Sequence, residues 1–184
     1  MHALSDSPAG DRPSQLSRSL FVERFGDVWE HSPWIAEDAH AAGLDAGADT
    51  AEGLHAAMAR AMRTGSREQR HALLAAHPDL AGRLAAAGEL TPDSTAEQAS
   101  AGLDRLTPEE RARFTALNEA YRARFGIPFI IAVKGLTKAE ILAAFEARLA
   151  STAEAEFDTA LAEVEKIALI RLRERLPARG ATDR

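Results

Sequence analysis

The segment HPDLAGRLAAAGELTPDSTAEQ, residues 77–98, is the stretch around which the chain is organised. It begins with a His-Pro step and ends with Ser94, Glu97 and Gln98, which lie within about one helical turn. A residue before proline is pushed away from helical backbone angles, so His77 is predicted to end the helix before it. Because a base, a carboxylate and an amide gather here, we interpret the segment as part of an active site that the rest of the chain positions.

The composition favours an all-α fold. The chain has 184 residues, of which 46% are hydrophobic and only 5% aromatic. This length fits one domain, and the alanine-rich, β-branched-poor sequence suits helices. We therefore expect a single compact domain of about eight to nine helices over residues 16–176. Residues 1–15 are expected to be a disordered tail and residues 177–184 a frayed one.

Charge and composition exclude several classes of function. The formal net charge is −6, which gives the chain no broad electrostatic attraction to nucleic acid or anionic lipid. The absence of cysteine excludes disulfides, thiolate metal sites and a cysteine nucleophile. No apolar run approaches the ~20 residues that span a bilayer, and the polar N-terminus is not a secretory signal. We expect a cytoplasmic protein.

Hydrophobic spacing and capping signals place the helices. The pairs Thr107/Glu110 and Thr137/Glu140 are typical of capping boxes, and Gly126 is placed to end a helix. Ser94 is predicted to open a helix after a loop at 88–92. The apolar run 127–133 is predicted to be extended or tightly buried. The predicted helices span 16–29, 33–42, 52–63, 67–76, 79–87, 94–103, 108–125, 138–149 and 152–176.

His77 is the first candidate for chemistry. Its position at a helix C-terminus favours a protonated ring, because the negative end of the helix dipole lies there. A histidine with a purely local structural role is the alternative. Ser94 and Glu97 also have a structural alternative, because Ser-x-x-Glu is itself the capping-box pattern. Gln98 adds a donor and an acceptor beside Glu97, although glutamine on a helix is usually solvated.

Arg171 lies among apolar residues on the last helix. It follows Ile167 by four positions and Ala168 by three, so it shares the apolar stripe. An inward arginine needs a partner, and a carboxylate-bearing ligand would be one. The alternatives are a snorkelling side chain or a structural ion pair. The chain lacks phosphate-loop, dinucleotide-binding, zinc-helix and nucleophile-elbow motifs, and its six histidines are scattered, so a metal site has little support.

Several motifs occur together and in order between residues 16 and 175. They are Glu30-His31-Ser32-Pro33-Trp34, His77-Pro78-Asp79-Leu80, Ser94-x-x-Glu97-Gln98-x-x-Ala101-Gly102-Leu103, Asn118-x-x-Tyr121-x-x-Arg124-Phe125-Gly126, Pro128-Phe129-Ile130-Ile131-Ala132-Val133-Lys134-Gly135 and the segment from Lys166 to Leu172. Each motif is weak evidence alone. Because all of them occur together and in the same order, the chain resembles the OHCU decarboxylases, the last enzymes of the route from urate to (S)-allantoin.

The resemblance implies an all-α homodimer that uses no metal or organic cofactor. The implied substrate is 2-oxo-4-hydroxy-4-carboxy-5-ureidoimidazoline. Two positions are mild departures from the family, Ile127 where phenylalanine is common and Ala132 where many members have cysteine. The implied catalytic residues are His77 and Glu97, and the implied substrate-binding residues are Pro78, Ser94, Gln98, Phe129, Ile130, Ile131, Ala132, Val133 and Arg171.

Two other functions stay open from the residues alone. The chain would be a non-enzymatic helical binding module if the run 127–133 lay on an exposed patch, with Trp29 and Trp34 as anchors. It would be a decarboxylase or hydrolase of a related ureido-ring compound if the same residues served another substrate. Burial of the run in a pocket with His77 and Glu97 would count against the binding module.

Overall fold

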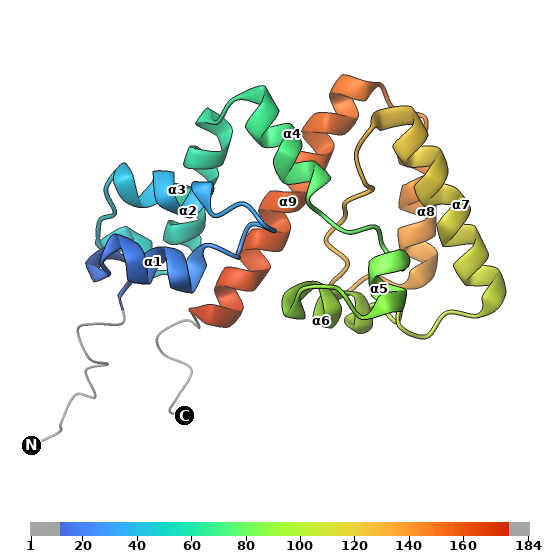
Figure 1. The fold of residues 1–184 in the computed structure, drawn as a ribbon, viewed down its shortest axis with the longest axis horizontal. Coiled ribbons are helices and arrows are strands. Elements are labelled where there is room, and N and C mark those ends of the chain that lie inside the picture. The colour runs from blue at the N-terminus through green and yellow to red at the C-terminus, as the bar shows by residue number, and fades with distance from the viewer. Residues whose placement is uncertain (1–11, 177–184) are drawn as a thin grey trace, which may run out of the picture. The chain divides into compact units, whose positions relative to one another are not determined.

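The computed structural model describes residues 12–176, without the side chains of residues 84 and 86. These residues contain nine α-helices, two short 3-10 helices and no strand, so the predicted all-α fold of about eight to nine helices is confirmed (Figure 1). The elements are η2 (Pro13–Gln15), α1 (Arg18–Phe25), α2 (Trp34–Ala41), η3 (Ala46–Asp49), α3 (Ala51–Thr64), α4 (Arg67–Ala75), α5 (Arg83–Ala87), α6 (Pro92–Ser100), α7 (Pro108–Phe125), α8 (Lys138–Arg148) and α9 (Ala153–Arg175).

The expected tails fall largely outside the described residues. Residues 1–11 and 177–184 are not described, whereas η2 is described and contacts η3. The contacts between residues divide the rest into two compact units. We call residues 12–66 with 168–176 the N-terminal unit and residues 67–167 the central unit. The chain passes from one unit to the other twice, between residues 66 and 67 and again inside α9, between residues 167 and 168.

The N-terminal unit packs three helices in sequence. Helix α1 contacts α2, and α2 contacts α3, which also contacts η3. Helix α1 ends at Phe25 rather than at residue 29, and the Gly26 N–H donates its last helical hydrogen bond, to the Val22 carbonyl. Val28 and Trp29 are still buried, on the turns that follow the helix. The largest fully buried side chains of this unit are Trp29, Phe21, Phe25, Ile35, Leu54, Met58 and Met62.

The central unit has an aromatic core. Helix α7 contacts α8, and Phe129, from the irregular run after α7, stacks on Phe145 of α8 with ring centroids 3.8 Å apart. Tyr121 of α7 meets both rings edge-on. Contacts between aromatic rings stabilise a protein beyond the burial of their apolar surface. This cluster therefore fixes the run 127–133 against α7 and α8.

Most helix ends follow the predicted chemistry. Thr107 with Glu110 and Thr137 with Glu140 form complete capping boxes, and Gly126 ends α7 in the left-handed conformation. The predicted start at Ser94 is wrong. Helix α6 begins at Pro92, and the Thr91 side chain caps it by accepting a hydrogen bond from the Ser94 backbone N–H. Residue 94 is therefore the third residue of the helix.

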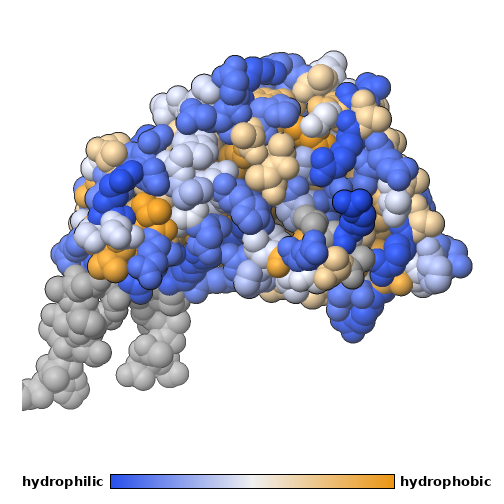
Figure 2. Space-filling view, in the orientation of Figure 1, coloured by the Kyte–Doolittle hydropathy of each residue, from blue (hydrophilic) through white to orange (hydrophobic). Residues whose placement is uncertain are grey.

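The surface of the described residues is mainly polar. Figure 2 shows hydrophilic residues over most of the visible face, with hydrophobic residues in smaller groups between them. Leu20, 53% accessible, is the one large hydrophobic side chain that is exposed in the described part of the chain. None of the helices described is both long enough and apolar enough to cross a membrane.

Candidate active site

His77 follows the last turn of α4 and precedes Pro78, as predicted. Its side chain is buried, and its Nδ1 lies 2.9 Å from the carbonyl oxygen of Leu73. Because a carbonyl can only accept, Nδ1 must carry the hydrogen of this bond. In the neutral ring the lone pair therefore lies on Nε2, which is the nitrogen left to act as a base.

Three side chains from other elements hold the irregular segment after His77. The Asp79 carboxylate accepts from Arg122 Nε at 2.9 and 3.1 Å. The Leu80 carbonyl accepts from Asn118 Nδ2 at 2.9 Å, and the Ala81 N–H donates to Gln98 Oε1 at 2.9 Å. Ala81 has φ +51°, an uncommon conformation for a residue with a Cβ. Such conformations persist where the surroundings over-determine them, as these three bonds do.

Helix α6 presents three of the predicted residues on one face. Glu97 and Gln98 follow Ser94 by three and four positions, so both lie one turn along the helix from Ser94, on the same side. Ser94 and Gln98 are buried and Glu97 is half-buried. Because Thr91 caps α6, the Ser94-x-x-Glu97 pattern is not the capping box of this helix. The capping-box alternative for Ser94 and Glu97 is therefore removed. The same Thr-Pro start at Thr107 could have revealed Thr91 as the cap.

Gln98 connects α6 to the His77 segment. Its Oε1 accepts the Ala81 N–H, 17 residues away in sequence. This bond fixes the orientation of the amide, since only the oxygen can accept, and it leaves the NH₂ group as the part that can donate to another partner. Gln98 therefore anchors the segment that carries His77, and its NH₂ group is the donor that it can offer to a ligand.

Replacing Gln98 by leucine should lower the free energy of unfolding by about 1–3 kcal/mol, because the buried Ala81 N–H would lose its acceptor. Urea denaturation measures the change. Gln15→Leu, at an exposed position in η2, is the control and should have little effect. A loss below about 0.5 kcal/mol would contradict an anchoring role for Gln98.

The run 127–133 is held by its backbone. The Ile130 carbonyl accepts from Arg148 Nη1 at 2.7 Å, and the Ala132 N–H donates to Glu163 Oε2 at 2.9 Å. These two groups are thus occupied by protein. Phe129, Ile130 and Val133 are buried, whereas Ile131 and Ala132 are half-buried. The run does not form the exposed apolar patch that a binding module would need, and Ile131 and Ala132 are its members most accessible to a ligand.

The side chains that support this run were not predicted from the sequence. Arg148 donates through Nε to Glu156 at 2.8 Å, and Tyr121 donates its hydroxyl hydrogen to the same carboxylate. The Arg148 guanidinium also lies 4.5 Å from the centroid of the Phe129 ring. Glu156 is almost fully buried, at 1% exposure. It lies on α9 in the segment EAEFD, and as a charged residue on a helix it was not predicted to face the core.

Tyr121 is the one tyrosine of the chain, so its ionisation can be followed by tyrosinate absorbance. Burial, together with the hydrogen bond to Glu156, raises the pKa of Tyr121 above its ordinary value of 10.0. Above about pH 10 the unfolded chain loses this proton first, so the free energy of unfolding should fall as pH rises further. Native protein should show no tyrosinate at a pH where denatured protein is ionised. The Tyr121→Phe variant should lack this part of the pH dependence, and a native midpoint near 10 would contradict the prediction.

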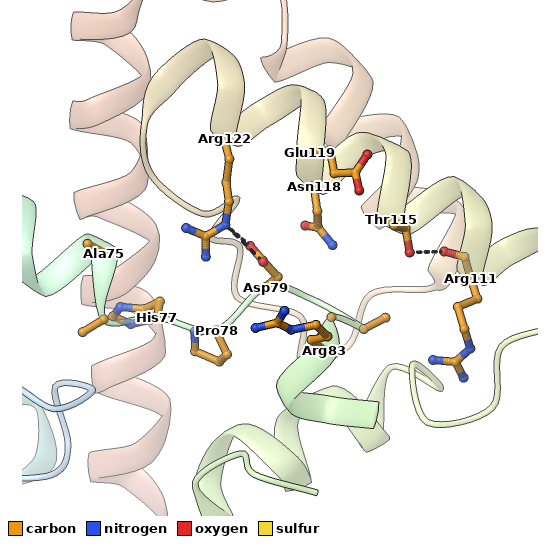
Figure 3. A pocket seen from close by; sticks show the side chains of 13 residues that line it. Ala75, His77, Pro78, Asp79, Arg83, Arg111, Thr115, Asn118, Glu119 and Arg122 are labelled. Carbon is orange, nitrogen blue, oxygen red and sulfur yellow. Dashed lines mark hydrogen bonds and ion pairs between the residues drawn. The ribbon is translucent and has the colours of Figure 1, made fainter. Parts of the chain in front are cut away.

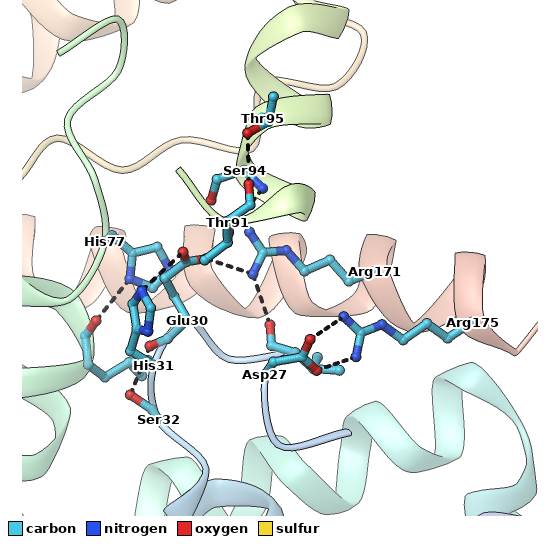
Figure 4. A network of polar contacts seen from close by, with 12 residues as sticks. Asp27, Glu30, His31, Ser32, His77, Thr91, Ser94, Thr95, Arg171 and Arg175 are labelled. Atoms are coloured by element: carbon cyan, nitrogen blue, oxygen red, sulfur yellow. Dashed lines mark hydrogen bonds and ion pairs between the residues drawn. The ribbon is translucent and has the colours of Figure 1, made fainter. Parts of the chain in front are cut away.

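Arg171 is buried, as its place on the apolar stripe predicted, and its partner within the N-terminal unit is Glu30. Its Nη1 lies 2.8 Å from Glu30 Oε2 and 3.3 Å from the Val28 carbonyl oxygen. Both charged side chains are 2% exposed. Figure 4 shows the Arg171 guanidinium directed at Glu30, with the Asp27–Arg175 pair farther along α9. The ion-pair alternative for Arg171 is therefore present. Glu30 is buried and belongs to the motif Glu30-His31-Ser32-Pro33-Trp34, but no role was predicted for it from the sequence.

A cavity of about 610 Å³ opens beside His77 and Pro78. Its walls come from the end of α4, the segment 77–83 and one face of α7 (Figure 3). Of the predicted site residues, only His77 and Pro78 line it. Within the described chain, no group of three or more His, Cys, Asp or Glu side chains is arranged to hold a metal ion.

Comparisons with known proteins agree along the length of the chain. A family model described as OHCU decarboxylase matches residues 14–173. The chain is 46% identical over 162 residues to the 2-oxo-4-hydroxy-4-carboxy-5-ureidoimidazoline decarboxylase of Haloferax volcanii, covering 88% of this chain and 92% of that protein. It is 37% identical over 164 residues to the protein of the same name from Mus musculus, covering 89% and 90%.

Solved structures share the fold. The chain is similar to a crystal structure of (S)-allantoin synthase, with a TM-score of 0.68 and 34% identity over 89% of this chain and 52% of that one. It also superimposes on a crystal structure of OHCU decarboxylase in the presence of (S)-allantoin, with a TM-score of 0.62 and 21% identity over 78% of this chain and 91% of that one. The second likeness is one of fold.

Proposed function

The chain belongs to the OHCU decarboxylase family, and on that premise we propose that it decarboxylates 2-oxo-4-hydroxy-4-carboxy-5-ureidoimidazoline to (S)-allantoin in urate degradation, without a cofactor. The observation that supports this most directly is the bond between Gln98 and the Ala81 N–H. It sets the segment carrying His77 beside the turn of α6 that carries Glu97. The two residues assigned to catalysis thus belong to neighbouring elements of one unit.

The substrate can supply its own electron sink. The carbon that loses CO₂ also bears a hydroxyl group and adjoins the ring carbon of a C=N bond. When the bond to the carboxylate breaks, its electron pair forms a carbon–carbon double bond, and the C=N electrons move to nitrogen, which takes a proton. Loss of the hydroxyl proton then forms the carbonyl, while the ring carbon bearing the ureido group takes a proton. Protonation on one face gives one enantiomer.

We assign proton transfer at the hydroxyl and carboxylate region to His77 and Glu97. Since Nδ1 of His77 is bonded to Leu73, Nε2 is the atom that would take the hydroxyl proton. The Glu97 carboxylate would pair with the imidazolium and stabilise its charge. Both groups belong to well-packed elements, and such fixed geometry is what makes proton transfer efficient.

The other assigned residues would bind and orient the ring. Gln98 would donate its NH₂ group to a ring oxygen, and Arg171, fixed by Glu30, would bind the negative charge of the substrate. The half-buried Ile131 and Ala132 would wall the ring, with Phe129, Ile130 and Val133 behind them. Pro78 and Ser94 would complete the binding surface beside His77 and Glu97.

The test is to generate the unstable substrate in situ, from urate with the two enzymes that act before this one on the route, and to follow the formation of optically active product by circular dichroism. With this protein added, optically active allantoin should form faster than in the blank. Equal rates with and without the protein would refute the proposed function. Offering other ureido-ring compounds in the same assay separates this reaction from that of a related decarboxylase or hydrolase.

We propose further that the chain acts in the cytoplasm as a homodimer. The family resemblance supports the dimer, and a composition without cysteine suits the reducing cytoplasm. Light scattering coupled to size-exclusion chromatography should give twice the monomer mass of 19.7 kDa. A mass that stays at the monomer value over a wide concentration range would refute the dimer.

A further inference from the structure

The cavity beside His77 lies on the opposite side of the His77 segment from α6. The Leu80–Ala81 peptide shows this directly, because its carbonyl accepts from Asn118 of α7 and its N–H donates to Gln98 of α6. No peptide bond in the described chain is cis, and in a trans peptide the C=O and N–H point in opposite directions. The cavity wall formed by α7 therefore faces the segment from the side opposite to Gln98.

The α7 wall is a polar stripe. Arg111, Thr115, Asn118 and Arg122 follow one another at spacings of four, three and four residues, so they share one face of the helix. All four line the cavity, together with Asp79 and Arg83 from the opposite wall. Figure 3 shows Asn118 and Arg122 pointing from α7 towards the segment, and Arg83 extending towards Pro78 beneath Asp79.

Asn118 has a buried acceptor without a partner. The residue is 6% exposed, its Nδ2 donates to the Leu80 carbonyl, and its Oδ1 accepts no hydrogen bond from any described residue. Since the amide nitrogen must face Leu80 to donate, the orientation of the amide is fixed. Oδ1 is therefore the atom of the side chain that has no hydrogen-bond partner among the described residues. An unsatisfied buried acceptor destabilises the protein, so a hydrogen-bond donor on a bound molecule would be favourable here.

The same cavity has cations without carboxylate partners. Arg122 is bonded to Asp79, but neither Arg83 nor Arg111 makes a hydrogen bond or ion pair with its side chain to any described residue. Three arginines line the cavity against two carboxylates, those of Asp79 and Glu119. The excess positive charge favours an anionic ligand and disfavours an ammonium group as the donor to Asn118.

We propose that this cavity is a second ligand site, which binds a small molecule carrying both a carboxylate and a neutral N–H of the amide or ureido type. The carboxylate is bound by Arg83 and Arg111, and the N–H donates to Asn118 Oδ1. The site is separate from the assigned residues on α6, because none of Ser94, Glu97 and Gln98 lines it. His77 and Pro78, which do line it, are the assigned residues that it shares with the proposed active site. The ligand bridges α7 and the segment 77–83.

Calorimetric titration of the full chain with N-carbamoylglycine tests the proposal, because this probe carries both groups. Acetate carries only the carboxylate and methylurea only the N–H groups. We expect N-carbamoylglycine to bind at least about fivefold more tightly than either, since each fragment loses one of the two contacts. Amide resonances of residues 77–83 and 111–122 should shift on binding.

Matched variants locate the probe. Arg111→Gln should weaken binding by about fivefold, as the loss of one exposed charge contact would. Arg113→Gln is the control, because Arg113 lies on the same helix but pairs with Glu146 and does not line the cavity. Glu97→Gln should leave binding unchanged. The proposal is overturned if N-carbamoylglycine does not bind, if Arg111→Gln and Arg113→Gln behave alike, or if Glu97→Gln abolishes binding while Arg111→Gln does not.

Discussion

Replacing His77 by alanine is expected to lower the turnover number for decarboxylation by about 10²-fold or more while leaving the helical fold intact. The loss follows from the removal of Nε2, the atom assigned to proton transfer at the substrate hydroxyl. The fold should survive because the hydrogen bond to the Leu73 carbonyl, which the substitution removes, contributes a net free energy of about 1 kcal/mol. Turnover is measured by the chirality assay and folding by far-ultraviolet circular dichroism.

His71→Ala is the matched control for this variant. His71 lies on the same helix, α4, but is exposed and outside the cavity, so its loss should change turnover by no more than about twofold. Glu97→Gln keeps the size of the side chain and removes its charge, and it should lower turnover in the same direction as His77→Ala. If the two residues act as a pair, the double variant should be little worse than either single variant. Full activity in either single variant would refute its assigned role.

Replacing Glu30 by leucine is expected to lower the free energy of unfolding by about 3–5 kcal/mol, because it leaves Arg171 as a buried charge without its carboxylate. Both side chains are 2% exposed and 2.8 Å apart, so water cannot substitute for the lost partner. Urea denaturation of the variant and the parent chain measures the difference. Asp27→Asn is the control. Its pair with Arg175 is at the surface, with Asp27 71% exposed, and the loss should stay within about 1 kcal/mol.

A second substitution separates stability from function. Glu30→Leu combined with Arg171→Met replaces the buried ion pair by apolar side chains, and such replacements often restore stability. The double variant should therefore recover much of the loss seen in Glu30→Leu, yet remain deficient in turnover, because the cation assigned to the substrate is gone. A double variant that is as unstable as Glu30→Leu, or one that is fully active, would contradict the roles given to this pair.

Local chemistry predicted the fold well. The composition indicated helices, and the capping boxes at Thr107 and Thr137 formed as expected, because each depends on residues within one turn. The same reasoning misplaced the start of α6. Ser94-x-x-Glu97 satisfies the capping pattern, but Thr91-Pro92 lies one turn earlier and provides a cap followed by a proline at the first helical position. Of the two competing starts, the one with a proline at the first helical position is the start that forms, as it is in α7.

The contacts that build the candidate site are mostly distant in sequence. Glu30 and Arg171 are 141 residues apart, and Asn118 and Leu80 are 38 apart. Hydrophobic periodicity indicates which face of a helix is buried. It does not identify the polar residue, distant in sequence, that pairs with a polar side chain on that face. Arg171 was therefore predicted to face inward without its partner. Glu156 was not predicted at all, because a glutamate on a helix is ordinarily exposed to solvent.

The Leu80–Ala81 peptide also has a consequence for motion. Because its carbonyl and its N–H are both bonded to side chains of flanking helices, this irregular segment opens only when both bonds break together. The Ala81 amide should then exchange its hydrogen with solvent as slowly as amides inside a helix, and faster exchange there would signal release from α6. His77 is thus carried by a segment that has the sequence of a loop and the rigidity of a regular element.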